Sequence, residues 1–127
     1  SFKSNLEVSV YKHLLQAGFK PKYEEETFTL IDNFTPTVPF YGRIGKDKNL
    51  VADMRKIRSV KYTPDFIIET TGKKVFIEVK GFENDVVYLK KKLFRRWLEN
   101  NPIEGIKYYY FEIFTISHLK EALSIIL

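Results

Sequence analysis

Residues 60–80 constrain the fold more strongly than any other part of the chain, because they predict a β-hairpin. Two runs rich in β-branched and aromatic residues, 60–69 and 73–80, flank a short turn that ends in Gly72. Such runs, separated by a few turn residues with a glycine, are typical of paired antiparallel strands. The chain has 127 residues, the usual length of one domain with one core. We therefore expect residues 1–127 to form a single domain around this hairpin.

Apolar spacing and capping residues predict the other elements. Helices are expected over residues 5–17, from about 84 to 100, and after a cap at Ser117. Strands are expected within residues 23–31 and over 107–114. The order is therefore helix, strand, irregular segment, strand, strand, helix, strand, helix.

The irregular segment spans residues 32–59, where prolines and glycines interrupt both the helical and the strand period. It is rich in cations, namely Arg43, Lys46, Lys48, Arg55, Lys56 and Arg58. A segment of this length inside a compact domain is usually functional or disordered. We interpret it as a long basic loop or as a hairpin with a mobile tip.

The residues that could carry chemistry lie on the predicted hairpin. Side chains alternate between the two faces of a strand, so Glu78 and Lys80 share one face. Asp65 follows a proline in the preceding strand, and the hairpin can bring its carboxylate beside that of Glu78. Two carboxylates that close repel each other unless a cation lies between them or one keeps its proton.

This set of side chains predicts metal-assisted hydrolysis of a phosphodiester. Mg²⁺ binds through one or two carboxylates together with water and phosphate oxygens. A neighbouring lysine stabilises developing negative charge or helps to deprotonate a water molecule. For an isolated Glu-x-Lys sequence, an exposed ion pair is the simpler interpretation. The presence of Asp65 beside Glu78 favours a metal site over an exposed ion pair.

These residues resemble the PD-(D/E)xK nuclease superfamily. Pro64 and Asp65 are followed, after twelve residues, by Glu78-Val79-Lys80, and the element order is similar to the αβββαβ core of that superfamily. Together with residues 5–7 (NLE) and 62–66 (YTPDF), the run EVKG is similar to the bacteriophage endonuclease I family of junction-resolving enzymes. Residues 80–82 (KGF) and 89–94 (LKKKLF) also resemble a phage-encoded branch of the superfamily.

The resemblance implies an α/β fold with a mixed sheet, a restriction-endonuclease-like αβββαβ core and flanking helices. It also implies roles for individual residues. Asp65 and Glu78 would hold Mg²⁺, which Mn²⁺ could replace, with the Val79 carbonyl as a further ligand. Lys80 would position or activate the attacking water, and Glu7 would be an additional acidic residue. The alternative interpretation of Glu7 is a solvated or first-turn charge that favours the helix dipole.

The same resemblance implies a Mg²⁺-dependent endodeoxyribonuclease of phage type, acting on branched or junction DNA in the cytoplasm of a bacterial or phage-infected cell. Cutting both strands of a junction would need two sites, and a two-fold homodimer would supply them. One alternative is a restriction-like, nicking or end-processing nuclease. Another is a non-catalytic nucleic-acid-binding domain of the same fold.

The expected contacts with DNA are basic side chains. The net charge of +5 favours a polyanionic partner. The helix after the motif carries Lys90, Lys91, Lys92, Arg95 and Arg96. If its buried stripe is Val86, Leu89, Leu93 and Trp97, then Lys91 and Arg95 lie on the solvent side. A second phosphate strand could be held by Arg43, Lys46, Arg55 and Arg58 of the 32–59 segment. The simpler interpretation of the basic helix is a solubilising face.

Several classes of protein are excluded or disfavoured. The chain has no cysteine, so disulfides, zinc–thiolate sites and cysteine nucleophiles are excluded. No apolar run approaches the ~20 residues that a membrane-spanning helix needs, so no membrane partner is expected. The first residues also lack the pattern of a secretory signal.

Overall fold

The computed structural model describes residues 1–46, 48–81 and 83–127, and it is built around a four-stranded mixed sheet. The strands lie in the order β1 (Lys22–Tyr23), β6 (Phe66–Thr70), β7 (Lys73–Val79) and β8 (Lys107–Ile113). β1, β6 and β7 pair antiparallel, whereas β8 runs parallel to β7. The predicted α/β class with a mixed sheet is confirmed.

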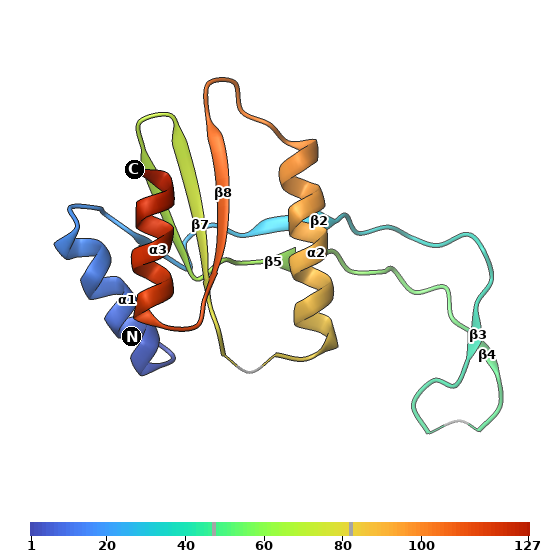
Figure 1. Cartoon of the computed structure of the whole chain (residues 1–127). Helices are drawn as coiled ribbons and strands as arrows, with labels where there is room; N and C mark the ends of the chain where they lie inside the picture. The colour runs from blue at the N-terminus through green and yellow to red at the C-terminus, as the bar shows by residue number, and fades with distance from the viewer. Residues whose placement is uncertain (47, 82) are drawn as a thin grey trace.

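Helices cover both faces of this sheet (Figure 1). On one face, α1 (Asn5–Gln16) and α3 (Ile116–Ile126) bury an aliphatic core against β6, β7 and β8. On the other face, α2 (Asp85–Asn100) buries a second core that is mainly aromatic. The alternation of strand side chains decides which core each residue joins, so Val75 and Ile77 enter the first and Phe76 the second.

The predicted strand over residues 60–69 is interrupted at residues 63–65, and its two halves join different sheets. β5 (Val60–Tyr62) pairs antiparallel with β2 (Phe28–Ile31) in a small sheet beneath α2, whereas β6 joins the central sheet. Proline explains the break, because Pro64 has no N–H to donate and restricts the residue before it. The predicted strand over 23–31 is likewise divided between β1 and β2.

Capping side chains set where the helices begin. Ser4 caps α1 by accepting a hydrogen bond from the Glu7 N–H at 3.1 Å, and Asn84 caps α2 in the same way. The predicted cap of the last helix at Ser117 is wrong. Thr115 holds this position, and its hydroxyl accepts a hydrogen bond from the His118 N–H at 3.2 Å.

The predicted buried stripe of α2 is wrong in part. Trp97 packs against the core as predicted, but Val86 and Leu89 are 59% and 56% exposed, and Phe94 is the buried residue of this helix. The aromatic rings beneath the helix explain the difference, since they select a large planar side chain at the centre of the contact. This rotation of the helix changes which of its lysines face solvent.

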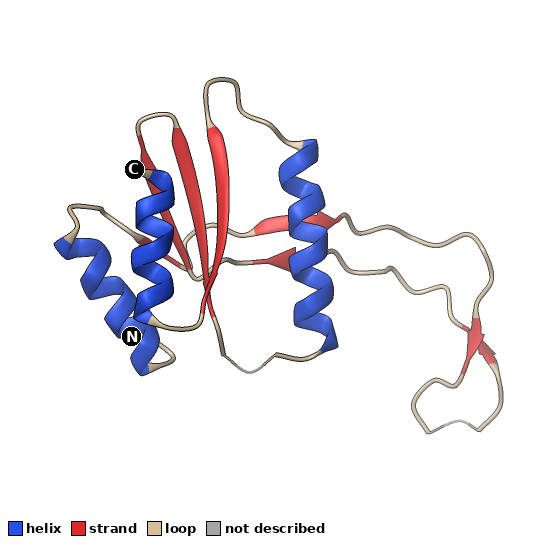
Figure 2. Cartoon of the chain, in the orientation of Figure 1, coloured by secondary structure: helices blue, strands red, loops and turns tan. Residues whose placement is uncertain are grey.

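Residues 32–59 form a two-stranded arm that projects away from the body of the molecule (Figures 1 and 2). It leaves the small sheet, is held by an isolated bridge between Phe34 and Ile57, and pairs again where β3 (Tyr41–Gly42) meets β4 (Val51–Ala52). The paired residues of this segment are therefore antiparallel, as in a hairpin. Asp47 of the arm lies outside the described residues.

Candidate active site

The structure brings the two predicted metal ligands together. Asp65 lies immediately before β6, and Glu78 lies near the end of the neighbouring strand β7. The Val79 N–H donates a hydrogen bond of 2.7 Å to Asp65 Oδ2, which ties the first carboxylate to the strand of the second. Both carboxylates line one open pocket of about 550 Å³, called here the acid pocket. Both also line an adjoining smaller pocket of about 320 Å³.

Glu7 adds a third carboxylate beside this pair. It lines the smaller pocket with Asp65 and Glu78. Glu7 does lie in the first turn of α1, but it is only 6% exposed, so the solvated part of the alternative interpretation is wrong. Its Oε1 accepts hydrogen bonds from the Tyr23 hydroxyl at 2.7 Å and from the Lys3 N–H at 3.0 Å. The Ser4 cap starts α1 at the point that aims Glu7 toward β6.

The carboxylates destabilise one another's charged form. Burial raises the pKa of Asp65, and the carboxylate of Glu7 raises it further, while the hydrogen bond from Val79 opposes the shift. Burial also raises the pKa of Glu78, and the Asp65 carboxylate adds to that increase. A cation placed between the two groups would relieve both effects.

The buried Tyr62 holds Glu78 and is itself hydrogen-bonded to the half-buried Tyr110, and sequence analysis missed this role. The Tyr62 hydroxyl donates a hydrogen bond to Glu78 Oε1, and its oxygen lies 2.7 Å from the Tyr110 hydroxyl oxygen. Burial raises the pKa of both tyrosines above the ordinary value, so both stay protonated at neutral pH. Tyr62 is part of the YTPDF motif, but its partner Tyr110 lies 48 residues away, and no local pattern links them.

The structure does not bring Lys80 to the carboxylate pair. β7 ends at Val79, and the Lys80 side chain is exposed, with its Nζ 4.9 Å from the centroid of the Phe114 ring. Lys80 lines neither pocket, whereas Val79 lines the smaller one. The strict strand alternation that places Lys80 on the face of Glu78 does not continue past the strand end. Phe82 of the predicted motif lies outside the described residues.

Lys91 faces inward, so its predicted position on the solvent side of α2 is wrong. Its side chain is 11% exposed and donates hydrogen bonds to Glu83 and Glu112. Burial lowers its pKa, but these two carboxylates more than offset that effect and leave the pKa raised. Lys91 also lies close enough to Glu78 to lower the pKa of that carboxyl. Sequence analysis had no signal for this ion cluster, because Glu112 is 21 residues away on β8.

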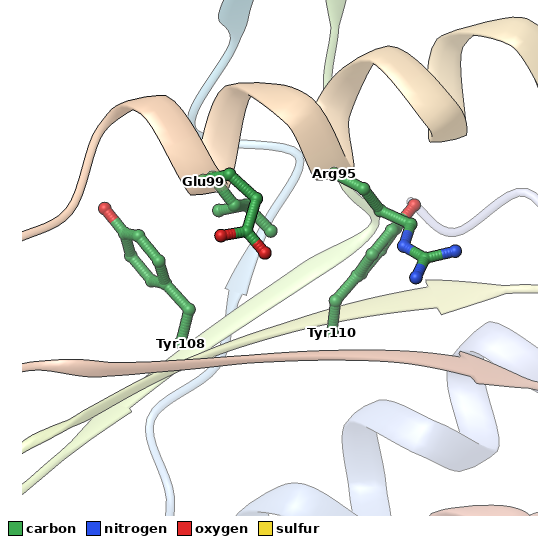
Figure 3. A pocket seen from close by; sticks show the side chains of 5 residues that line it. Arg95, Glu99, Tyr108 and Tyr110 are labelled. Carbon is green, nitrogen blue, oxygen red and sulfur yellow. The ribbon is translucent and has the colours of Figure 1, made fainter.

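The other predicted DNA contacts fall on three surfaces. Lys90 lines the acid pocket. A shallow pocket on α2 is lined by Lys92, Arg95, Arg96 and Glu99. Figure 3 shows Arg95 and Glu99 above Tyr108 and Tyr110, which line the adjacent pocket between α2 and the sheet.

The remaining four lie on the arm, namely Arg43, Lys46, Arg55 and Arg58. Arg55 forms an ion pair of 2.8 Å with Asp53, so part of its charge is already neutralised within the arm. Arg58 lines a pocket at the arm's root together with Lys56 and Lys61.

The donor set fits a hard divalent cation that keeps part of its water shell. Within residues 1–46, 48–81 and 83–127, no group of three or more His, Cys, Asp or Glu side chains is arranged so that it could hold a metal ion. Mg²⁺ is typically bound through one or two carboxylates with several waters. Asp65 and Glu78 provide two such carboxylates, and burial raises the pKa of each.

A comparison with models of protein families identifies the family of this chain. The model of a family described as a protein of unknown function (DUF1064) matches residues 1–110. The chain belongs to the DUF1064 family. The DUF1064 match includes every residue that lines the two carboxylate pockets, and it also includes the arm. No curated protein matches the chain.

Within the ranges that the structure describes, none of the helices combines the length and the apolar character that a membrane span requires.

Proposed function

We propose that this DUF1064 chain is a Mg²⁺-dependent endodeoxyribonuclease of the PD-(D/E)xK type. The observation that carries the proposal is the convergence of Asp65 and Glu78, from neighbouring strands, on one pocket that Glu7 also adjoins. The pair and its flanking residues are those of the resemblance to PD-(D/E)xK nucleases. The order α1, β1, β6, β7, α2, β8 supports the same assignment.

Each residue of the site has a role in this proposal. Asp65 and Glu78 hold Mg²⁺ or Mn²⁺, and the Val79 carbonyl is a further ligand. When bound, the ion supplies Lewis acidity and lowers the pKa of a bound water. Tyr62 keeps Glu78 oriented through its hydrogen bond. Glu7 adds negative charge beside Asp65. Lys80 assists the attacking water after its side chain leaves the Phe114 ring, which a flexible exposed lysine does at little cost.

Branched or junction DNA is the proposed substrate, on the basis of the resemblance to the endonuclease I family. Resolution of a junction requires two cuts, so the active form in this proposal is a homodimer. A restriction-like, nicking or end-processing nuclease would use the same site on another DNA structure.

The position of Lys80 favours a second candidate function, a nucleic-acid-binding domain without catalysis. In this alternative, the basic side chains of α2 and the arm hold DNA, and the carboxylates have no ion to activate water. The two candidates differ in one measurable property, because only the first one cuts DNA.

The test is a cleavage panel of linear, nicked, flapped and four-way DNA at low salt with Mg²⁺ or Mn²⁺. Asp65→Asn and Glu78→Gln should each abolish cutting and leave binding largely intact. Glu121→Gln is the matched control, since Glu121 is exposed on α3 and lines neither pocket. If every substrate survives with both metals while it still shifts on a gel, the binding-domain alternative replaces the nuclease proposal.

A further inference from the structure

Lys61 connects the acid pocket to the arm. It lines the acid pocket together with Asp65 and Glu78. It also lines a second open pocket, of about 480 Å³, at the root of the arm. The two pockets therefore share one exposed lysine on β5. Sequence analysis did not select this lysine as a binding residue.

The second pocket is cationic. Lys56 and Arg58 line it beside Lys61, and the other lining residues, Asn33 and Ser59, are neutral. Residues 56–61 contain three cations and no acidic residue. None of the three cations has an ion-pair partner within the described parts of the chain. A solubilising surface more commonly mixes both signs of charge.

The lining of the acid pocket also contains basic side chains, although it holds the carboxylates of Glu24, Asp65 and Glu78. Lys90 of α2 lines it together with Lys61. The hydroxyls of Thr27 and Thr63, whose oxygens are 2.7 Å apart, also line it. Lysine and hydroxyl groups are the usual partners of backbone phosphates, and they carry no base preference.

We propose that Lys56, Arg58 and Lys61 form a phosphate track that guides one DNA strand from the acid pocket to the root of the arm. This inference rests on the proposed function for its ligand, the sugar–phosphate backbone of DNA. Lys56 and Lys61 are five positions apart, and an extended chain covers at most roughly 16 Å over that distance. The three cations of the track can each contact one phosphate, so the track is matched to about three nucleotides of one strand.

The test measures binding without cleavage. Fluorescence anisotropy of a labelled linear duplex, in EDTA and over a series of salt concentrations, gives the dependence of log K on log salt. Each phosphate contact contributes about 0.9 to the magnitude of that slope. The triple variant Lys56→Ala, Arg58→Ala, Lys61→Ala should therefore reduce the slope by about 2 to 3.

A matched control removes the same charge from the opposite side of the sheet. Lys12, Lys20 and Lys120 are exposed on or beside α1 and α3. The triple alanine variant at these positions should change the slope by less than about one contact. Circular dichroism of both triples confirms that they are folded. The proposed phosphate track would be overturned if the two triple variants reduced the salt slope equally. It would also be overturned if the variant at positions 56, 58 and 61 left the slope unchanged.

A second readout locates the strand. Neutral methylphosphonates placed at successive positions should weaken wild-type binding over about three adjacent nucleotides, and the triple variant should be insensitive at those positions. Sensitivity that persists in the variant contradicts the inference. The phosphate track and the nuclease proposal can fail separately. If the track variant weakens DNA binding but no DNA is ever cut, only the phosphate track is supported. If DNA is cut but the two triple variants bind it equally well, only the nuclease proposal is supported.

Discussion

Hydrogen bonds from three different elements hold the acidic side chains around the acid pocket. Tyr23 of β1 donates to Glu7, the Val79 N–H donates to Asp65, and Tyr62 of β5 donates to Glu78. Orientation by such partners is what a metal site needs in order to keep its ligands in place. The residues that orient the ligands are therefore as informative as the ligands themselves.

Replacement of Tyr62 by phenylalanine tests this arrangement. Tyr62→Phe removes the hydrogen bond that lowers the pKa of Glu78, so that pKa should rise, by roughly one pH unit if the bond contributes about 1.4 kcal/mol. The measurement is the titration of the Glu78 carboxyl by carbon NMR in the absence of metal.

Tyr108→Phe is the matched control for that substitution. The Tyr108 hydroxyl donates to the Asn101 carbonyl at 2.7 Å and has no contact with Glu78. It should leave the titration of Glu78 unchanged. If Glu78 had the same pKa in Tyr62→Phe as in the unaltered protein, the Tyr62 hydroxyl would not stabilise the Glu78 carboxylate.

At the scale of the elements, α2 is positioned by an aromatic core. Phe94 is 0% exposed and contacts the rings of Phe28, Tyr62, Phe76 and Tyr110. Two of these rings, Tyr62 and Tyr110, belong to the hydrogen-bonded group that holds Glu78. The packing of α2 therefore supports the acid pocket as well as the fold.

Truncation of Phe94 should be strongly destabilising. Phe94→Ala leaves a cavity among large rings, and we expect a loss of about 3–5 kcal/mol in the free energy of unfolding. Leu89→Ala, on the exposed side of the same helix, should cost no more than about 0.5 kcal/mol. Urea unfolding of both variants checks the prediction. Equal losses would favour the stripe predicted from sequence over the packing in the structure.

The arm contributes to neither core. Every buried residue of both clusters lies outside residues 32–59. Large apolar side chains along it remain exposed, among them Val38, Phe40 and Leu50. The body should therefore fold without the outer part of the arm.

Replacement of residues 36–55 by a short glycine-containing turn tests this independence. The free energy of unfolding should change by no more than about 1 kcal/mol, since no core contact is lost and a shorter loop costs slightly less entropy. Thermal unfolding followed by circular dichroism is the measurement. A variant that fails to fold would show that the arm is part of the cooperative unit.

For the whole molecule, the buried carboxylates link stability to pH and to metal. The folded state raises the pKa of Asp65 and Glu78, so it binds more protons than the unfolded state above about pH 4. Their contribution to stability is therefore present at low pH and is lost as the pH rises through the raised values. In the proposed nuclease a bound divalent cation would reverse the loss, because it would bind the folded state.

The expected result is a metal-free melting temperature that falls from mildly acidic to neutral pH, by a few degrees for each ~1 kcal/mol of lost stability. Added Mg²⁺ should raise it again at neutral pH. Asp65→Asn should flatten the pH dependence and weaken the response to Mg²⁺, which separates this effect from other carboxyl groups. A wild-type response to Mg²⁺ in Asp65→Asn would place the ion elsewhere.

Local sequence patterns were sufficient for the framework of the molecule. The hairpin formed by β6 and β7, the order of helices and strands, and the closeness of Asp65 to Glu78 all follow from strand alternation, turn residues and caps. These signals act over a few residues, so they are readable from the chain alone. Pro64 was visible too, but its effect of dividing one strand between two sheets depends on where each half finds a partner.

Only the tertiary structure decided which distant side chains meet. The rotation of α2 about its axis, the inward position of Lys91 and the pairing of Tyr62 with Tyr110 depend on contacts between residues far apart in the chain. Helical spacing allows several apolar stripes on α2, and the aromatic rings beneath it select the one with Phe94. The sequence thus determines the elements and the acidic pair, whereas packing determines the groups that hold that pair in place.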